Sequence, residues 1–163
     1  MPQDRLQPSL LDRITDLNPE AKSEPSDQRY LNSRQLRAAI VRDLGWLLNT
    51  GRLEATTPLD GYPAVARSVL NYGIPELSGT LLSNVNITML ERSVRSAIID
   101  FEPRIRRHSL TVRVLVDEDA NARNMLTFEI EAEAWGYPGP LHFLLKTEMD
   151  LEHGHVSIVD FGG

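Results

Sequence analysis

The chain has 163 residues, with 17 Lys plus Arg, 23 Asp plus Glu, no cysteine and a net charge of −6. This length predicts one domain, since domains average roughly 150 residues, and the negative charge excludes a protein that binds nucleic acid through a basic surface. The lack of cysteine excludes disulfides, thiolate catalysis and Cys-based zinc sites. Because the first 20 residues contain no long apolar run, we expect a cytoplasmic protein with neither a cleaved leader nor a membrane helix.

The charge is distributed unevenly along the chain. Residues 1–108 carry 14 basic and 13 acidic side chains, whereas residues 109–163 carry 3 basic and 10 acidic ones. Of the 17 basic residues, 15 are Arg. Arg forms fixed, bidentate contacts with carboxylates, so this bias indicates protein contacts, although an Arg-rich genome would produce the same bias.

The first 31 residues have the pattern of an arm. Ser9 is a candidate N-cap for a short helix with the apolar residues Leu10, Leu11, Ile14 and Leu17. A polar stretch of Pro, Glu, Lys, Ser and Asp follows over residues 18–29. We therefore predict an arm with a short amphipathic helix and a polar tether over 1–31, and a single domain over 32–163.

Three helices are predicted in the first part of this domain. The first begins at Asn32 or Ser33 and ends at Gly51, with Leu36, Ile40, Leu44, Leu47 and Leu48 at helical spacing. The second begins at Pro63 and ends at Gly73, with the apolar residues Val65, Val69 and Leu70. The third begins with a capping box of Thr88 and Glu91 and ends near Phe101, because Pro103 cannot continue a helix.

The apolar period changes to two after His108, which predicts antiparallel strands. The first strand covers Leu110 to Val116, and turn residues follow from Asp117 to Asn121. The second runs from Leu126 to Ala134 and has an acidic face of Glu129, Glu131 and Glu133. A Gly-Pro loop over residues 136–140, a third strand from Leu141 to Met149 and a short last strand from Val156 to Val159 complete the pattern. Helices followed by a sheet of three or four antiparallel strands make an α+β fold.

The most unusual local sequence is Glu102-Pro103-Arg104, which joins the last helix to the first strand and precedes Arg106 and Arg107. Proline fixes the backbone φ angle, so Glu102 and Arg104 lie on either side of a rigid corner. Such a corner can present both charges to a partner. The alternative is that Glu102 and Arg104 pair with each other or cap the helix end.

Catalytic and metal-binding patterns are weak in this sequence. Glycoside hydrolysis needs one carboxyl group that stays protonated, and the arginines beside Glu102 favour its ionised form instead. His153, His155 and His142 lack the defined spacing of a zinc site. There is no Gly-rich phosphate loop, Gly-x-Ser-x-Gly elbow or His-Glu-x-x-His. We therefore predict a binding protein that is not an enzyme and holds neither a metal nor a cofactor.

Several segments together resemble a known family. Leu10-Leu11-Asp12-Arg13-Ile14, Ser68-Val69-Leu70-Asn71-Tyr72-Gly73-Ile74-Pro75 and Phe101-Glu102-Pro103-Arg104 are similar to the TssE family, the baseplate wedge components of bacterial type VI secretion systems. These belong with the small wedge proteins of contractile-phage baseplates, a family that has carried a "lysozyme-like" label. The resemblance extends from about Leu10 to the C-terminus.

This resemblance implies partners and site residues. The partners it implies are the wedge subunits TssF and TssG and the sheath subunits TssB and TssC, with TssK and the inner tube protein as further candidates. The implied location is cytoplasmic, at a baseplate docked on the inner membrane. The implied partner-binding residues are Glu102, Pro103 and Arg104 with the neighbouring Arg106 and Arg107, and Val156 and Ile158 in the last strand.

An exposed strand edge offers unpaired N–H and C=O groups to a partner strand, so the resemblance also implies that sheath assembly begins by pairing with the edge near Val156–Val159. The alternative is an ordinary edge protected by its short length. Two other function classes stay open: a regulatory anti-adaptor that uses the Arg-rich corner, which secretion genes beside this one would exclude, and a peptidoglycan hydrolase, which lysis of cell walls by purified protein would reveal.

Overall fold

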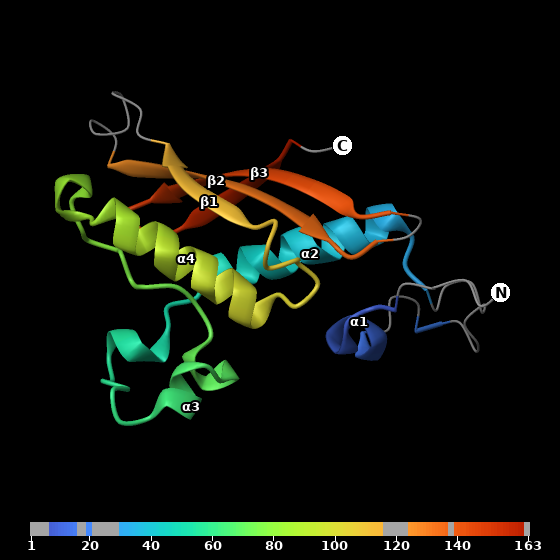
Figure 1. Ribbon diagram of the computed structural model, residues 1–163, viewed down its shortest axis with the longest axis horizontal. Helices are drawn as coiled ribbons and strands as arrows, with labels where there is room; N and C mark the ends of the chain where they lie inside the picture. The colour runs from blue at the N-terminus through green and yellow to red at the C-terminus, as the bar shows by residue number, and fades with distance from the viewer. Residues whose placement is uncertain (1–6, 16–18, 21–29, 116–123, 137–138, 162–163) are drawn as a thin grey trace.

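The structure is a computed structural model that describes residues 7–15, 19–20, 30–115, 124–136 and 139–161. Its helices precede its strands, as the sequence predicts (Figure 1). The α-helices are α1 (Leu10–Ile14), α2 (Ser33–Leu48), α3 (Pro63–Ala66) and α4 (Ile87–Phe101), and the 3₁₀ turns are η1 (Leu53–Ala55), η2 (Val69–Asn71) and η3 (Leu82–Asn84). The strands are β1 (Thr111–Leu115), β2 (Met125–Ala134), β3 (Leu141–Asp150) and β4 (Val156–Asp160). The predicted α+β fold is therefore confirmed.

The sheet is a four-stranded antiparallel meander in the order β1-β2-β3-β4. Its register pairs Val112 with Ile130, Ile130 with Leu145 and Met149 with Val156. In β2 and β3 the even and odd positions respectively are buried, so both strands turn one apolar face inward. The opposite face carries Arg113, Glu129 and Lys146 on adjacent strands, in a row of alternating charge. β1 and β4 are the two edge strands.

Helix α2 forms where its apolar spacing predicts it. Asn32 is the N-cap, and its side chain and that of Gln35 form a reciprocal capping box at 2.8 and 2.9 Å. The helix buries one stripe of side chains against the sheet, and these are Leu36, Ala39, Ile40, Leu44, Leu47 and Leu48.

Helix α4 begins earlier than predicted. Asn86, not Thr88, is its N-cap, and the Asn86 side chain accepts the backbone N–H of Met89. Glu91 makes no capping box, because its carboxylate accepts the backbone N–H of Val114 in β1 at 2.8 Å. The predicted capping box is therefore wrong, although the helix ends at Phe101 as expected.

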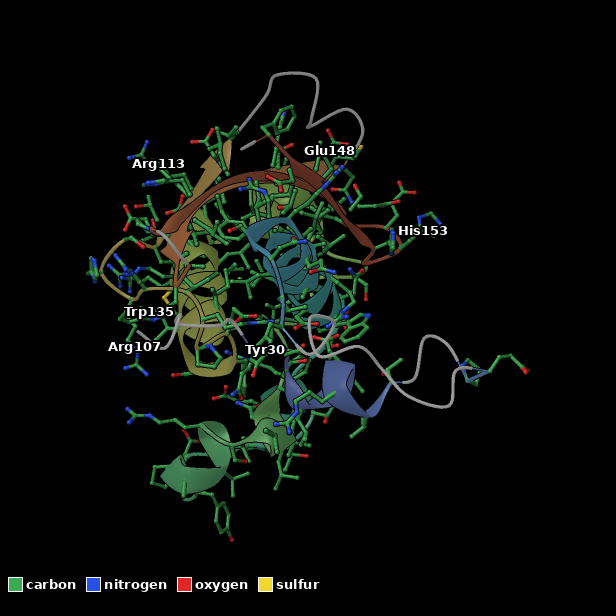
Figure 2. All side chains as sticks on the ribbon, turned by 90° about the vertical axis from the view of Figure 1, so that its right-hand side faces the viewer. Tyr30, Arg107, Arg113, Trp135, Glu148 and His153 are labelled. Atoms are coloured by element: carbon green, nitrogen blue, oxygen red, sulfur yellow. The ribbon has the colours of Figure 1, made fainter. Side chains whose placement is uncertain are left out.

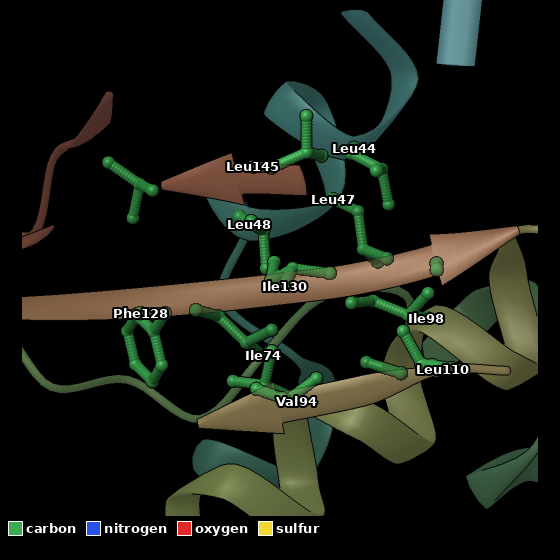
Figure 3. Packing of buried hydrophobic residues seen from close by; sticks show 14 of the residues in the cluster. Leu44, Leu47, Leu48, Ile74, Val94, Ile98, Leu110, Phe128, Ile130 and Leu145 are labelled. Atoms are coloured by element: carbon green, nitrogen blue, oxygen red, sulfur yellow. The ribbon is translucent and has the colours of Figure 1, made fainter. Parts of the chain in front are cut away.

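The core lies between the concave face of the sheet and helices α2 and α4 (Figure 2). Figure 3 shows Leu44 and Leu47 of α2, Val94 and Ile98 of α4 and Phe128 and Ile130 of β2 packed together. Leu44, Ile98, Ile130 and Leu145 are all fully buried. The layers are thus one sheet and two helices.

The first part of the segment between α2 and α4, with η1, α3 and η2, forms a lobe below the helices (Figure 1). The predicted helix from Pro63 to Gly73 is wrong, because α3 ends at Ala66 and only a 3₁₀ turn follows. Asn71, which is buried, holds the lobe together: its side chain accepts the N–H of Glu54 and donates to the carbonyl of Ala66. Val69 and Leu70 of the lobe are 79% and 66% exposed.

Gly73 connects this lobe to the core. Its φ is +126°, and a Cβ atom there would lie 2.2 Å from the carbonyl oxygen of Thr50. The close approach lets Ile74 donate its N–H to that same oxygen at 2.9 Å and bury its side chain.

The N-terminal arm contributes α1, which begins after its predicted N-cap Ser9. Leu10 and Ile14 are 73% and 72% exposed, so this helix buries no apolar face. The predicted features at Leu17, at the polar tether over 21–29 and at the 117–121 turn lie outside the described residues. Among the described helices, none is long and apolar enough to cross a membrane.

We expect Leu145→Ala to lower the free energy of unfolding by about 2–5 kcal/mol, because it empties a fully buried site. Leu144→Ala is a matched control on the outer face of the same strand, where the side chain is 40% exposed, and we expect it to cost under about 1 kcal/mol. Urea denaturation followed by circular dichroism measures both. Equal losses would contradict this assignment of the inner face.

Candidate functional site

The Glu-Pro-Arg corner follows directly from the end of α4. Glu102 caps the helix by donating its N–H to the carbonyl of Ile98, and Pro103 prevents another turn. The next residues lie beside the end of β2 and bond to it through the backbone. The N–H of Arg106 donates to the backbone carbonyl of Glu133 at 2.8 Å, and the N–H of Trp135 donates to the backbone carbonyl of Arg104 at 3.0 Å. These backbone hydrogen bonds with the end of β2 therefore hold the corner in place.

The two charges of the corner face each other. Glu102 is only 3% exposed, and Arg104 donates from Nε to its Oε1 at 2.6 Å and from Nη2 to its Oε2. The backbone N–H of Arg104 donates to the same Oε1 at 3.1 Å. The structure thus shows the pairing that the sequence left as the alternative to an outward display of both charges.

A second carboxylate from α2 completes the contact. Asp43 Oδ2 accepts a hydrogen bond from Arg104 Nη2 at 2.5 Å. Burial lowers the pKa of Arg104, but the hydrogen bonds and charges of Glu102 and Asp43 outweigh it and raise that pKa above its usual range. Arg104 therefore stays a fixed cation that ties α2 to the end of α4.

The two central motifs of the family resemblance meet at this cluster. The ring of Tyr72 packs edge-on against Phe101, with ring centroids 5.2 Å apart. Burial raises the pKa of the Tyr72 hydroxyl, and the nearby carboxylates of Asp43 and Glu102 raise it further. Segments 71–75 and 101–104 are thus neighbours in space although about 30 residues separate them along the chain.

The ion pairs continue from the corner to the N-terminal arm. Asp43 also accepts a hydrogen bond from Arg42 at 2.7 Å, and Arg42 reaches Asp12 of α1 at 2.6 Å while it covers the ring of Trp46. Five charged residues therefore connect α1, α2 and the corner, and they are Asp12, Arg42, Asp43, Arg104 and Glu102. Arg42 and Asp43 were not predicted from the sequence, since nothing in the pattern of α2 separates them from its other polar residues.

The solvent side of the corner is a groove beside the last turn of α4. Its lining includes Pro103 and Arg107, which are exposed, and the half-buried Arg106. Arg106 lies over the ring of Trp135 at 4.7 Å and pairs with Glu133 at 3.3 Å. Trp135 is 61% exposed, and the sequence pattern alone did not single it out. Three of the seven predicted partner-binding residues therefore gather here.

The two predicted residues in β4 lie differently. Val156 is buried at 3% exposure, and Ile158 is half-buried against the core. Their side chains point inward, whereas Val159 and Phe161 on the outer face are 50% and 61% exposed. What β4 offers at its free edge is therefore its backbone.

His153 and His142, two histidines of the β3–β4 hairpin, each lie beside a carboxylate. His153 Nδ1 lies 2.8 Å from Asp150, and the charge and hydrogen bond of Asp150 raise the His153 pKa. His142 lies 3.5 Å from Glu133 on the neighbouring strand. Within the described parts of the chain, no three His, Asp or Glu side chains gather in a way that could hold a metal ion.

We expect Arg104→Ala to lower the free energy of unfolding by about 3–5 kcal/mol, because it leaves Glu102 buried without a cation. Arg104→Lys should recover only part of this loss, since one ammonium cannot replace the guanidinium fork between two carboxylates. Chemical denaturation measures the loss, with the exposed Arg113→Ala as control. If Arg104→Ala were as mild as Arg113→Ala, the cluster would contribute nothing to the fold.

The contact between α1 and α2 through Asp12 and Arg42 should depend on pH. The hydrogen bond from Arg42 holds the pKa of Asp12 below its ordinary value of 3.8, against the opposing effect of burial. A lowered pKa means that the docked state gains stability above the ordinary pKa and loses it as pH falls through the lowered one. Carboxyl NMR titration should find the Asp12 pKa below 3.8 in the native protein and higher in Arg42→Met than in the native protein. Identical values in both proteins would show that Arg42 does not hold the arm.

Comparison with known proteins identifies the family. A family model described as "Baseplate wedge protein gp25" matches residues 34–138, from the first turn of α2 to beyond the end of β2, and this span includes the corner. A search of curated proteins finds no match. The family is structural, and its members contact other baseplate components. Because the match covers more than half of its length, the chain belongs to the baseplate wedge protein gp25 family, to which the resemblance in its sequence pointed.

Proposed function

We propose that this protein is the TssE-type wedge component of a type VI secretion baseplate. In this role it joins TssF and TssG and provides the surface on which the TssB/TssC sheath begins to assemble, at a baseplate on the cytoplasmic side of the inner membrane. It catalyses no reaction. Membership of the wedge family supports the baseplate role, and the similarity of the segments at Leu10–Ile14 and Ser68–Pro75 to TssE supports the secretion system.

The free edge of β4 carries the sheath part of this proposal. In β4 the backbone groups of alternate residues point away from β3, and those of Ile158 are among them. An extended segment of another chain can satisfy such groups by adding a fifth strand. The exposed side chains of Val159 and Phe161 would then contact the outer face of that strand.

The groove at the corner is the proposed contact with the wedge subunits. Pro103, Arg106 and Arg107 lie at the surface, together with Trp135. Exposed Trp and Arg side chains are the residues that most often dominate binding energy at protein interfaces. Glu102 and Arg104 support this surface from inside, so their part in binding is to position the corner.

The two proposed contacts are on opposite sides of the molecule. Figure 2 places Arg107 and Trp135 on one side and His153, in the hairpin before β4, on the other. The sequence divides its charge in a similar way, with a nearly neutral helical part and an acidic sheet. One rigid domain can therefore connect two different partners.

A non-catalytic role fits the state of Glu102. Both of its carboxylate oxygens accept hydrogen bonds from Arg104, so it is not arranged to donate a proton to a glycosidic oxygen. Degradation of peptidoglycan by the purified protein would contradict this part of the proposal.

Co-expression with TssF and TssG tests the wedge contact. We expect the native protein to co-purify with them and Arg107→Glu to reduce recovery at least tenfold, because bringing like charges together at an interface costs several kcal/mol. Arg113→Glu, on the outer face of β1, is the matched control and should bind normally. Equal recovery of both variants would place the wedge contact elsewhere.

A separate comparison tests the sheath contact. Ile158→Pro removes an N–H that points away from β3, whereas Ile158→Ala shortens the side chain and keeps that N–H. If a sheath strand pairs with β4, TssB/TssC binding should fall in Ile158→Pro well below that in Ile158→Ala. Melting temperatures of both variants show whether the domain remains folded. Equal binding by the two would contradict strand addition at this edge.

A further inference from the structure

Side chains from the two long helices cover both edges of the sheet. At the β1 edge, Glu91 of α4 accepts the N–H of Val114 at 2.8 Å. Arg95, one turn later on the same helix, donates to the carbonyl of Leu110 at 3.2 Å. Both bonds involve a charged group, and such bonds are stronger than those between neutral groups. Charged side chains of α4 therefore cover the β1 edge at Val114 and just before its start, at Leu110.

At the β4 edge, a neutral side chain covers the backbone of Val156, and it is that of Asn49 at the end of α2. Asn49 Oδ1 accepts the N–H of Val156 at 2.9 Å, and Asn49 Nδ2 donates to the carbonyl of the same residue at 2.9 Å. These are the donor and acceptor that a residue of a neighbouring strand would present. The carboxamide thus occupies the position of a fifth strand at one residue.

The hydrogen-bond pattern of β4 shows where this cover ends. Two backbone hydrogen bonds join this segment to β3: the carbonyl of His155 accepts the N–H of Asp150, and the N–H of Phe161 donates to the carbonyl of Leu144. Since orientation alternates along a strand, Val156 and Ile158 point their backbone groups to the free edge. Asn49 covers Val156, and in the described part of the chain no side chain bonds the outward groups of Ile158.

A second contact fixes the far end of β4. Arg37 of α2 holds Asp160 through two hydrogen bonds of 2.5 and 2.6 Å and donates to the carbonyl of His142 at 2.7 Å. The uncovered position at Ile158 therefore lies between two contacts from the same helix. Of these, the neutral contact at Asn49 is the weaker.

We propose that Asn49 is a placeholder for an incoming strand and leaves Val156 when that strand binds. The partner is an extended segment of another chain that pairs with the backbone of Val156 and Ile158 and places apolar side chains over Val159 and Phe161. This inference rests on the proposed addition of a sheath strand at β4. Until that partner arrives, Asn49 keeps the edge from pairing with a second copy of the chain.

The release of Asn49 determines how much of the edge the partner can use. With Asn49 in place, pairing can begin only at Ile158, close to the end of β4 at Asp160. With Asn49 displaced, pairing gains Val156, which lies one two-residue repeat earlier and adds about 7 Å of strand. The partner thus replaces two intramolecular hydrogen bonds with two of its own.

Asn49→Ala removes this competitor and tests the proposal. We expect it to bind the TssB/TssC pair about tenfold more tightly than the native protein, because the bound strand no longer has to break two neutral hydrogen bonds. Thr50→Val is the matched control, since it removes a hydrogen bond to the carbonyl of Trp46 at the same helix end without touching β4. It should bind like the native protein. Equal or weaker binding by Asn49→Ala than by the native protein would overturn the proposal.

A measurement on the native protein does not depend on how the variants fold. The side-chain amide protons of Asn49, observed by NMR, should lose their hydrogen bond to Val156 when unlabelled TssB/TssC is added. Retention of that hydrogen bond in the complex would show that the strand stops short of Val156 and would overturn the proposal.

Failure of the proposed function gives a different result. If neither the native protein nor Asn49→Ala binds TssB/TssC, the sheath contact is wrong, and light scattering then decides the role of Asn49. Concentration-dependent dimers of Asn49→Ala, with monomeric native protein and Thr50→Val, would support Asn49 as the cover of a pairing edge. Monomers throughout, with unchanged hydrogen exchange at the Val156 amide, would overturn it.

Discussion

The rest of the structure depends on the contact of Arg104 with two carboxylates, Glu102 at the end of α4 and Asp43 in α2. A carboxylate as buried as Glu102 destabilises a fold unless a cation neutralises it. With Arg104 fixed between them, the following residue, Ile105, enters the core and pairs with Ala134 at the end of β2. One guanidinium thus sets the position of both helices against the sheet.

This arrangement changes the meaning of the Glu-Pro-Arg corner. Its charges hold the fold together, and its surface is formed by neighbours that the charges position, chiefly Pro103, Arg107 and Trp135. A partner that binds this surface contacts a rigid platform, because the backbone of the corner is bonded to β2. Preorganisation of this kind lowers the entropy cost of association.

Regular periodicity made most of the fold predictable. The spacing from Leu36 to Leu48 and the alternation in β2 and β3 identified their elements, because one face of each is buried along its whole length. The prediction of one helix from Pro63 to Gly73 was wrong, since the Asn71 side chain makes hydrogen bonds to the backbone of its lobe where a helix would make backbone bonds. The predicted N-cap Thr88 was also wrong, because Asn86 caps α4 two residues earlier and Glu91 accepts the backbone N–H of Val114 at the edge of β1.

The sequence by itself determined the α+β class, the sites of the long helices and strands, and the segments through which the family is recognised. Only the tertiary structure decided that Glu102 points inward, that Asp43 is the second carboxylate bound to Arg104, and that Asn49 covers the edge at Val156. The physical reason is that the contacts of Asp43 and Asn49 join residues 61 and 107 positions apart in the chain, and that the burial of Glu102 depends on what packs around the end of α4. Local pattern records which face of an element is apolar, whereas the partner of a buried charge or an edge backbone group depends on how the elements pack.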